Sequence, residues 1–265
     1  MTTGPDSDRP DPPPPPPLEI DDGLIVPPPP VDDGGGEDEK VMTLVEHLSE
    51  LRTRILLALG AIVVAACFTL FYAGTLTRIV LRSASGIEFI ALTPMEVFFT
   101  QIKVGLIGAL ILAVPIISWQ IWTFVRPGLK QHEMSAFRFA APAASLLFVV
   151  GAAFAFFLVI PMAVKFLSSF TMEGVKSQYS LAAYTSFVLF LMLVMGLLFE
   201  CPLVILLLVR LGLVSRSILA AKRRHIVLGC FIVAAVVTPT PDMVTQALVA
   251  VPMWILFELT LLFMK

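Results

Sequence analysis

The feature that most constrains this chain is a series of apolar runs, most of them long enough to cross a bilayer as a helix. A hydrocarbon core of about 30 Å requires about 20 apolar residues at 1.5 Å per residue. Of the 265 residues, 57% are apolar and only 14% are charged. We therefore predict an all-α integral membrane protein with six transmembrane helices, at about residues 55–73, 98–123, 139–163, 184–209, 225–237 and 243–264.

The fifth and sixth runs are short. Residues 225–237 lie between the basic cluster 222–224 and the turn 238–242, and thirteen helical residues reach only about 20 Å. The sixth run is interrupted by Glu258. Since a short helix pair is accommodated by a thinner bilayer, by snorkelling or by partner helices, we expect local membrane thinning beside this pair.

Residues 1–42 have a different composition from the rest of the chain. Residues 1–40 contain two proline runs, and eleven acidic residues against two basic ones. Such a segment buries too little apolar surface to offset its chain entropy, which predicts a disordered acidic tail, with a proline-rich ligand for an adaptor domain as the alternative. Thr43 and Glu46 have the spacing of a capping box, so the membrane domain is expected to span 43–265. No cleavable signal peptide is expected, because the first apolar run begins only at Ile55.

The distribution of Lys and Arg predicts the orientation. Twelve of these residues fall on one side of the predicted spans and five on the other. The first set is Lys40, Arg52, Arg54, Arg126, Lys130, Arg138, Arg210, Arg216, Lys222, Arg223, Arg224 and Lys265. Because basic loops stay inside, both termini are expected to be cytoplasmic, in a multi-pass protein of a bacterial inner membrane.

The motifs of common enzymes are missing from the sequence. His132 and Glu133 begin an HExxH zinc motif, but Ala136 stands where the second His is needed. There is no Walker A run and no G-x-S-x-G elbow, and Asp242 is the only Asp beyond the tail, which excludes a two-aspartate intramembrane protease. The three Cys residues lie apart in separate apolar runs. We expect no enzyme, no metal, no cofactor and no nucleic-acid partner.

Carboxylates at membrane depth are candidate functional groups because they are costly there. Glu200 lies within the fourth run directly before Cys201 and Pro202, where the proline frees a backbone carbonyl. It is either a functional group or a protonated side chain bonded to that carbonyl. Glu258, and less deeply Glu96, are further candidates.

Two acidic residues outside the membrane indicate a function more specifically. Glu50 precedes the first span and is four residues from Arg54, so a simple helical ion pair is one interpretation. Glu133 follows the second span on the same predicted side. Two carboxylates in a basic rim suit a dicationic ligand, and forked pairing favours guanidinium over ammonium.

Two stretches of the sequence are similar to family signatures. The stretch His47-Leu-Ser-Glu50-Leu-Arg52-Thr-Arg54 resembles the HLxELRxR signature before the first span of the TatC family. The stretch Phe124-Val-Arg-Pro127-Gly128-Leu129-Lys-Gln-His-Glu133 resembles its FVxPGLxxxE loop. Further similarity, at Phe199 to Pro202 and at Thr238 to Asp242 with Gln246 and Pro252, extends the resemblance over residues 43–264.

The resemblance implies a glove-shaped fold with a concave face and a receptor role in twin-arginine protein export driven by the protonmotive force. It implies that twin-arginine signal peptides of folded precursors bind at Glu50, Glu133, Arg52, Phe124, Pro127, Leu129 and His132. Glu200 would line an intramembrane cavity. The single-span partners TatA and TatB would dock at Thr238, Asp242, Gln246 and Glu258, and self-association is expected.

The sequence departs from the family pattern in three places: the proline-rich tail, the first outer loop at Val80 to Ala84, and the turn Thr238 to Asp242, which is one residue longer than the usual TPPD. The rival interpretation is a proton-coupled secondary transporter that uses Glu200 and Glu258. Against it, the most specific acidic residues lie outside the membrane, and no paired repeat halves are visible in the hydropathy.

Overall fold

The computed structural model describes residues 44–84, 87–125, 139–170, 178–238 and 242–264. The chain divides into two units, Met1–Val41 and Met42–Lys265, and all described residues belong to the second. The expected acidic tail and the capping residue Thr43 lie outside the described residues, so these expectations remain predictions.

The described unit is almost entirely helical, as predicted. Five segments are long and apolar enough to cross a membrane: Val45–Phe71, Glu96–Val125, Ala140–Ser168, Leu181–Arg210 and Met243–Phe263. They comprise α1 (Leu44–Phe71), α3 (Glu96–Val125), α5 (Ala140–Phe154) continued by η3 (Ala155–Val159) and α6 (Ile160–Ser168), α7 (Leu181–Phe199) with α8 (Cys201–Arg210), and α11 (Met243–Phe263). A shorter sixth helix, α10 (Arg223–Val237), packs beside α11 and follows the short α9 (Arg216–Ala221). The predicted six membrane helices are confirmed.

The predicted shortness of the last two helices is confirmed as well. Helix α10 has 15 residues and α11 has 21, whereas the other four spans have 27 to 30. At 1.5 Å per residue, α10 is about 22 Å long, which is less than the hydrocarbon thickness. Membrane thinning beside α10 therefore stays a prediction.

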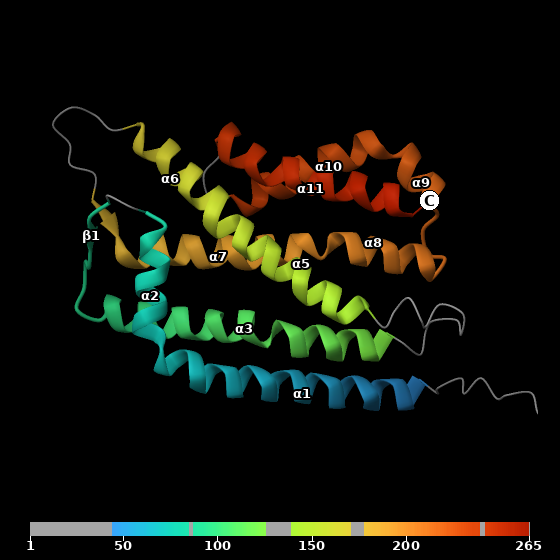
Figure 1. The fold of residues 1–265 in the computed structure, drawn as a ribbon, viewed down its shortest axis with the longest axis horizontal. Coiled ribbons are helices and arrows are strands. Elements are labelled where there is room, and N and C mark those ends of the chain that lie inside the picture. The colour runs from blue at the N-terminus through green and yellow to red at the C-terminus, as the bar shows by residue number, and fades with distance from the viewer. Residues whose placement is uncertain (1–43, 85–86, 126–138, 171–177, 239–241, 265) are drawn as a thin grey trace, which may run out of the picture. The chain divides into compact units, whose positions relative to one another are not determined.

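Helices α1 and α3 form an antiparallel pair along most of their length (Figure 1). The Arg54 guanidinium donates to Gln120 Oε1 at 3.2 Å, and the Thr69 hydroxyl donates to the Gly105 carbonyl at 2.7 Å. From the first contact to the second, the residue number rises by fifteen on α1 and falls by fifteen on α3. The start of α1 and the end of α3 therefore lie together, at an end of the unit that we call the Glu50 end.

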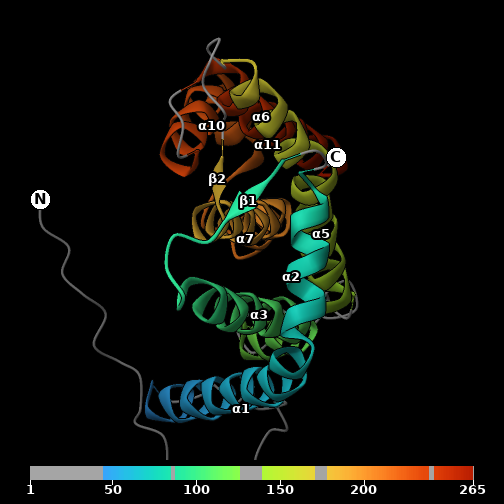
Figure 2. The ribbon, with the colours of Figure 1, turned by 90° about the vertical axis from the view of Figure 1, so that its left-hand side faces the viewer.

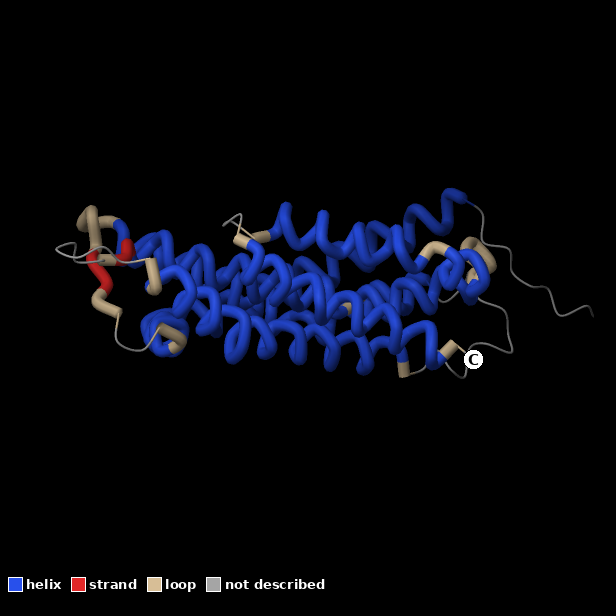
Figure 3. Tube along the Cα trace, turned by 90° about the horizontal axis from the view of Figure 1, so that it is seen from above, coloured by secondary structure: helices blue, strands red, loops and turns tan. Residues whose placement is uncertain are grey.

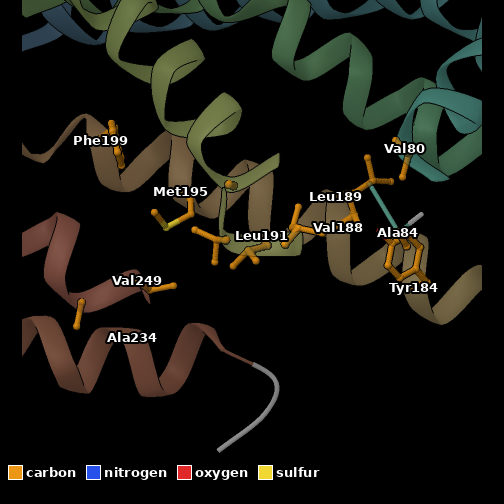
Figure 4. Close-up of a cluster of buried hydrophobic side chains, with 14 of the residues drawn as sticks. Val80, Ala84, Tyr184, Val188, Leu189, Leu191, Met195, Phe199, Ala234 and Val249 are labelled. Carbon is orange, nitrogen blue, oxygen red and sulfur yellow. The ribbon is translucent and has the colours of Figure 1, made fainter. Parts of the chain in front are cut away.

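Helix α7 occupies the centre of the core. Its residues Val188, Leu191 and Met195 are fully buried against Ile160 and Val249, which come from two other membrane-spanning segments (Figure 4). Seen along the long helices, the elements form a curved row from α1 and α3 to α10 and α11, with α7 inside the curve (Figure 2). Burial of apolar side chains within the unit leaves many other apolar side chains on the outside, as expected for a protein dissolved in lipid.

The fourth span is interrupted at the proline that was noted in the sequence. Helix α7 ends at Phe199 and α8 begins at Cys201, with Glu200 between them and Pro202 at the start of α8. Pro202 has no N–H to continue the ladder of hydrogen bonds, so the helix is interrupted at this point. A similar effect explains η3, a π-helical turn just before Pro161, since π-turns relieve the clash of a proline ring with the preceding turn.

Glycine decides where α8 ends. Gly212 has a φ of 71°, the left-handed conformation that favours glycine. The Gly212 N–H donates to the Val209 carbonyl at 3.1 Å and the Leu213 N–H to the Leu208 carbonyl at 3.0 Å. This pair of bonds is a Schellman motif, which reverses the chain after the fourth span.

The opposite end of the unit holds the two short strands, and we call it the strand end (Figure 3). The amphipathic helix α2 (Ala73–Arg82) follows α1 directly. Strand β1 (Phe89–Ile90) pairs in parallel with β2 (Tyr179–Ser180), so the chain before α3 is joined to the chain before α7. These strands were not predictable from the sequence, because two residues are too few to show a period.

Glu96 fastens the strand end. Its side chain is buried, and its carboxylate accepts hydrogen bonds from the Ser180 hydroxyl and the Ala182 N–H, both at 2.8 Å, and from the backbone N–H groups of Leu92 and Thr93. One carboxylate thus satisfies donors in the segment before α3 and at the start of α7, including an N–H at the first turn of α7 that has no partner within its own helix. The role is structural, whereas the sequence alone also allowed a functional one.

We expect Glu96→Gln to lower the Tm of the purified protein by roughly 5 °C, because the amide NH2 would face backbone donors instead of accepting from them. The matched control is Glu88→Gln, since Glu88 is an exposed acid at the same end. Thermal unfolding followed by circular dichroism in detergent measures the shift. An equal Tm for the two variants would contradict this role of Glu96.

Candidate functional site

The Glu50 carboxylate is held in a fixed position at the start of the first span. The Arg54 guanidinium donates to Glu50 Oε1 from two of its nitrogens, Nη2 at 2.9 Å and Nε at 3.3 Å. A third guanidinium nitrogen, Nη1, donates to Gln120 Oε1 on α3 at 3.2 Å. Arg54 therefore links the two helices while it orients the carboxylate.

The second carboxylate oxygen of Glu50 differs from the first in its hydrogen bonding. Oε2 is buried and has no hydrogen-bond partner among the described residues, and the Glu50 side chain as a whole is 18% exposed. The predicted ion pair with Arg54 is present, but it uses only one of the two carboxylate oxygens. Because an ionised carboxylate oxygen without a donor is costly when buried, this oxygen is a candidate acceptor for a ligand.

Two aromatic rings pack together at the Glu50 end of the unit. The His47 ring stacks on the Phe124 ring with 4.3 Å between centroids and 15° between planes. Phe124 is the penultimate residue of α3, so the predicted site residues Glu50 and Phe124 come together from two helices. Arg52 lies on the exposed side of α1.

Four predicted site residues fall in the segment that follows α3: Pro127, Leu129, His132 and Glu133 lie outside the described residues. The ends that this segment joins are described. Helix α3 ends at Val125 and α5 begins at Ala140, and both points lie at the Glu50 end of the unit (Figure 1). The connection that carries Glu133 therefore starts and finishes on the same side as Glu50.

Glu200 lies at the break between α7 and α8, half-buried. No hydrogen bond to its carboxylate is formed by the described part of the chain. The neighbouring Phe199 is buried against α5. The interruption at Pro202 thus places an acidic side chain within a membrane span, as predicted.

The residues predicted to dock partners join α10 to α11. The Asp242 carboxylate caps α11 by accepting from the Thr245 N–H at 2.6 Å. The Gln246 amide donates to the Phe231 carbonyl of α10 at 2.9 Å, and the buried Thr238 hydroxyl donates to the Ala234 carbonyl at 2.9 Å. The Gln246 contact joins the two helices, whereas the other two contacts each lie at the end of a single helix.

Glu258 lies near the other end of α11. Its carboxylate is 3.5 Å from the Arg223 guanidinium at the start of α10. It also lines a groove of about 330 Å³ with Trp254, Ile255, Leu259 and Leu262. The groove combines exposed apolar side chains with one acidic group, which is a surface that a helix with a polar side chain could occupy.

Gln120 and Lys103 make polar contacts between membrane helices that were not predicted from the sequence. Gln120 receives a hydrogen bond from Arg54, and Lys103 Nζ donates to the Ser186 hydroxyl of α7 at 2.7 Å. A lone Gln near the end of an apolar run was the available signal for the first contact. No signal identified the partner of Lys103, because Ser186 is eighty-three residues away in the sequence.

Comparison with known proteins decides the family. The family model for the Sec-independent protein translocase protein (TatC) matches residues 46–252. The chain belongs to the TatC family. TatC of Carboxydothermus hydrogenoformans is 36% identical over 230 residues, covering 86% of this chain and 95% of that one. TatC of Escherichia coli K12 is 36% identical over 232 residues, covering 86% and 90%.

Solved structures agree with this assignment. A crystal structure of the twin-arginine translocase receptor TatC has a TM-score of 0.71 at 35% identity and covers 82% of this chain and 97% of that one. A second TatC structure, in DDM, has a TM-score of 0.74 at 34% identity and covers 83% and 100%. The described protein is thus a multi-pass TatC component of a protein translocase, and it is a transport component and not an enzyme. The transporter interpretation is not supported.

Proposed function

We propose that this TatC chain receives the paired arginines of a signal peptide at Glu50 and Glu133. The observation that carries the proposal is the Glu50 carboxylate, with Oε1 held by Arg54 and Oε2 buried without a partner among the described residues. A guanidinium can donate to Oε2 without displacing Arg54. The second carboxylate is Glu133, on the connection between α3 and α5, whose two ends lie at the Glu50 end.

Arginine fits this arrangement better than lysine. A guanidinium is planar and offers several donors in a fixed fork, whereas an ammonium is a strongly hydrated point charge. The stacked rings of His47 and Phe124 lie at the same end and provide an apolar wall beside the acidic group. Phe124 is joined through Val125 to the segment with Pro127, Leu129 and His132, which we assign to the same peptide site together with Arg52.

Two further surfaces belong to the proposal. We assign the docking of single-span TatA- and TatB-type partners to the α10–α11 pair, because Glu258 and apolar side chains line a groove there and Gln246 lies on the same pair. We assign Glu200 to the lining of an intramembrane cavity. Both termini are placed in the cytoplasm, since the positive-inside rule puts the basic Glu50 end there.

The test measures peptide affinity. Purified protein in lipid nanodiscs is titrated with fluorescent signal peptides that differ only in the pair Arg-Arg, Lys-Lys or Gln-Gln. We expect the Lys-Lys peptide to bind at least tenfold more weakly than Arg-Arg, and the Gln-Gln peptide more weakly still. Equal affinity for the three peptides would contradict a guanidinium-binding site at Glu50 and Glu133.

A further inference from the structure

A large pocket lies on a side of the unit that the proposed peptide site does not use. Its volume is about 660 Å³, and helices α1, α2, α3, α5 and α7 line it together with η3. Phe68 of α1, Leu112 of α3 and Phe157 of η3 are examples of its walls. All lining side chains are apolar or carry a single hydroxyl, and none of the described residues that line it is charged.

The pocket lies at the depth of the bilayer. Its walls come from four of the five segments that are long and apolar enough to cross a membrane. Water would find few polar partners in such a space. Left empty, the lining atoms would lack the dispersion contacts that a packed interior makes. The pocket therefore calls for an apolar occupant that comes from the membrane.

The course of α2 favours an alkyl chain over a helix as the occupant. Helix α2 runs across the direction of the long helices at this place (Figure 1). Its residues Thr75, Leu76 and Ile79 form part of the wall. A straight transmembrane helix would collide with α2, whereas a flexible acyl chain can bend beneath it.

The charge on α2 fits a phospholipid headgroup. Helix α2 has two basic residues, Arg78 and Arg82, and no acidic one. Arg78 is exposed, follows Thr75 by one helical turn and directly precedes Ile79, and both Thr75 and Ile79 line the pocket. Its guanidinium makes no hydrogen bond or ion pair with the described residues. A guanidinium at this position can bind a phosphate group.

We propose that this pocket holds one acyl chain of a membrane phospholipid, with the lipid phosphate bound at Arg78. The lipid fills the space between the α1–α3 pair and α5, and it ties α2 to the membrane surface. The site takes a phospholipid and is independent of the peptide site at Glu50.

The experiment uses a phosphatidylglycerol with a photoreactive diazirine near the end of one acyl chain, in nanodiscs that contain the full chain. Labelled residues are mapped by mass spectrometry after illumination. We expect Leu112 and Val149, which line the pocket, to be labelled at least fivefold more than Val64 and Leu146, which are exposed apolar residues outside it. Uniform labelling of the four positions would overturn the proposal.

Gly108 provides a matched pair of variants. A Cβ atom built at Gly108 would be 3.5 Å from Leu76 and 3.7 Å from Thr69, which is ordinary contact, and Gly108 lines the pocket. Gly108→Ala should leave the labelling of Leu112 unchanged, whereas Gly108→Leu should lower it about fivefold and leave that of Val64 unchanged. Persistent labelling of Leu112 in Gly108→Leu would contradict an occupant of the pocket.

A second variant tests the headgroup without a change in the core. Arg78→Gln should reduce the labelling of Leu112 severalfold, and the reduction should be greater with an anionic phospholipid than with a zwitterionic one of the same acyl chains. If Arg78→Gln leaves the labelling of Leu112 unchanged, the proposed phosphate contact at Arg78 is excluded. A photoreactive residue at position 112 that captures a protein in intact membranes, and no lipid, would show that the occupant is a partner helix and overturn the proposal.

Discussion

Glu50→Gln is expected to weaken binding of an Arg-Arg signal peptide by roughly 30-fold to a few thousandfold. Removing one partner of a hydrogen-bonded charge pair at an interface costs about 2–5 kcal/mol, and 1.4 kcal/mol is a factor of ten. The glutamine oxygen can still accept from Arg54, as Glu50 Oε1 does. The amide NH2 then replaces the free Oε2 and presents donors to an incoming guanidinium. The fold is retained while the acceptor is lost.

Crosslinking of a photoreactive signal peptide to the purified protein and fluorescence titration both measure this loss. The control is Glu46→Gln, because Glu46 is an exposed acid one turn earlier on α1. Glu133→Gln is expected to have an effect of similar size on peptide affinity. If the two carboxylates bind adjacent arginines, the double variant of Glu50→Gln and Glu133→Gln should bind the Arg-Arg and Gln-Gln peptides with nearly equal affinity. Undiminished affinity in both single variants would exclude this site.

Gly151→Ala is expected to lower the free energy of unfolding by about 1–3 kcal/mol, although alanine favours a helix over glycine by roughly 0.5–1 kcal/mol. Gly151 of α5 faces α7. A Cβ atom there would be 2.5 Å from the Met195 carbonyl oxygen and 2.7 Å from Cγ of Phe199. The first of these atoms belongs to the backbone, so the two helices must move apart. Small residues at such crossings allow membrane helices to pack closely.

The matched control is Gly229→Ala on α10. A Cβ atom at Gly229 would have no atom within 4 Å, so only the gain in helix propensity applies. Unfolding in mixed micelles of increasing denaturing detergent measures both variants. Equal stabilities for Gly151→Ala and Gly229→Ala would show that the α5–α7 contact adapts without loss.

The number and order of the membrane helices were predictable from the sequence because each helix satisfies its own backbone in lipid. A run of apolar residues therefore identifies a span without knowledge of its neighbours. The break at Glu200 was predictable for a similar reason, since Pro202 interrupts the hydrogen bonds of its own helix wherever that helix packs. The short α10 follows from the spacing between Lys222 and Thr238.

The candidate site was only partly predictable. Glu50 and Arg54 are four residues apart, so their pairing follows from helical geometry. The contact of Arg54 with Gln120, sixty-six residues away, does not. This contact holds the Arg54 guanidinium between the two helices.

The sequence by itself determined the number and order of the membrane helices and the residue types that carry charge, since these depend on local hydrogen bonding and on transfer into lipid. The tertiary structure alone decided which distant groups meet: Glu96 with the start of α7, Gly151 with the Met195 carbonyl, and Arg54 with Gln120. The physical reason is that apolar helices in lipid have no strong pattern of hydrophobicity to show which side faces a neighbour. Close packing and a few polar contacts make that choice, and they depend on both helices at once.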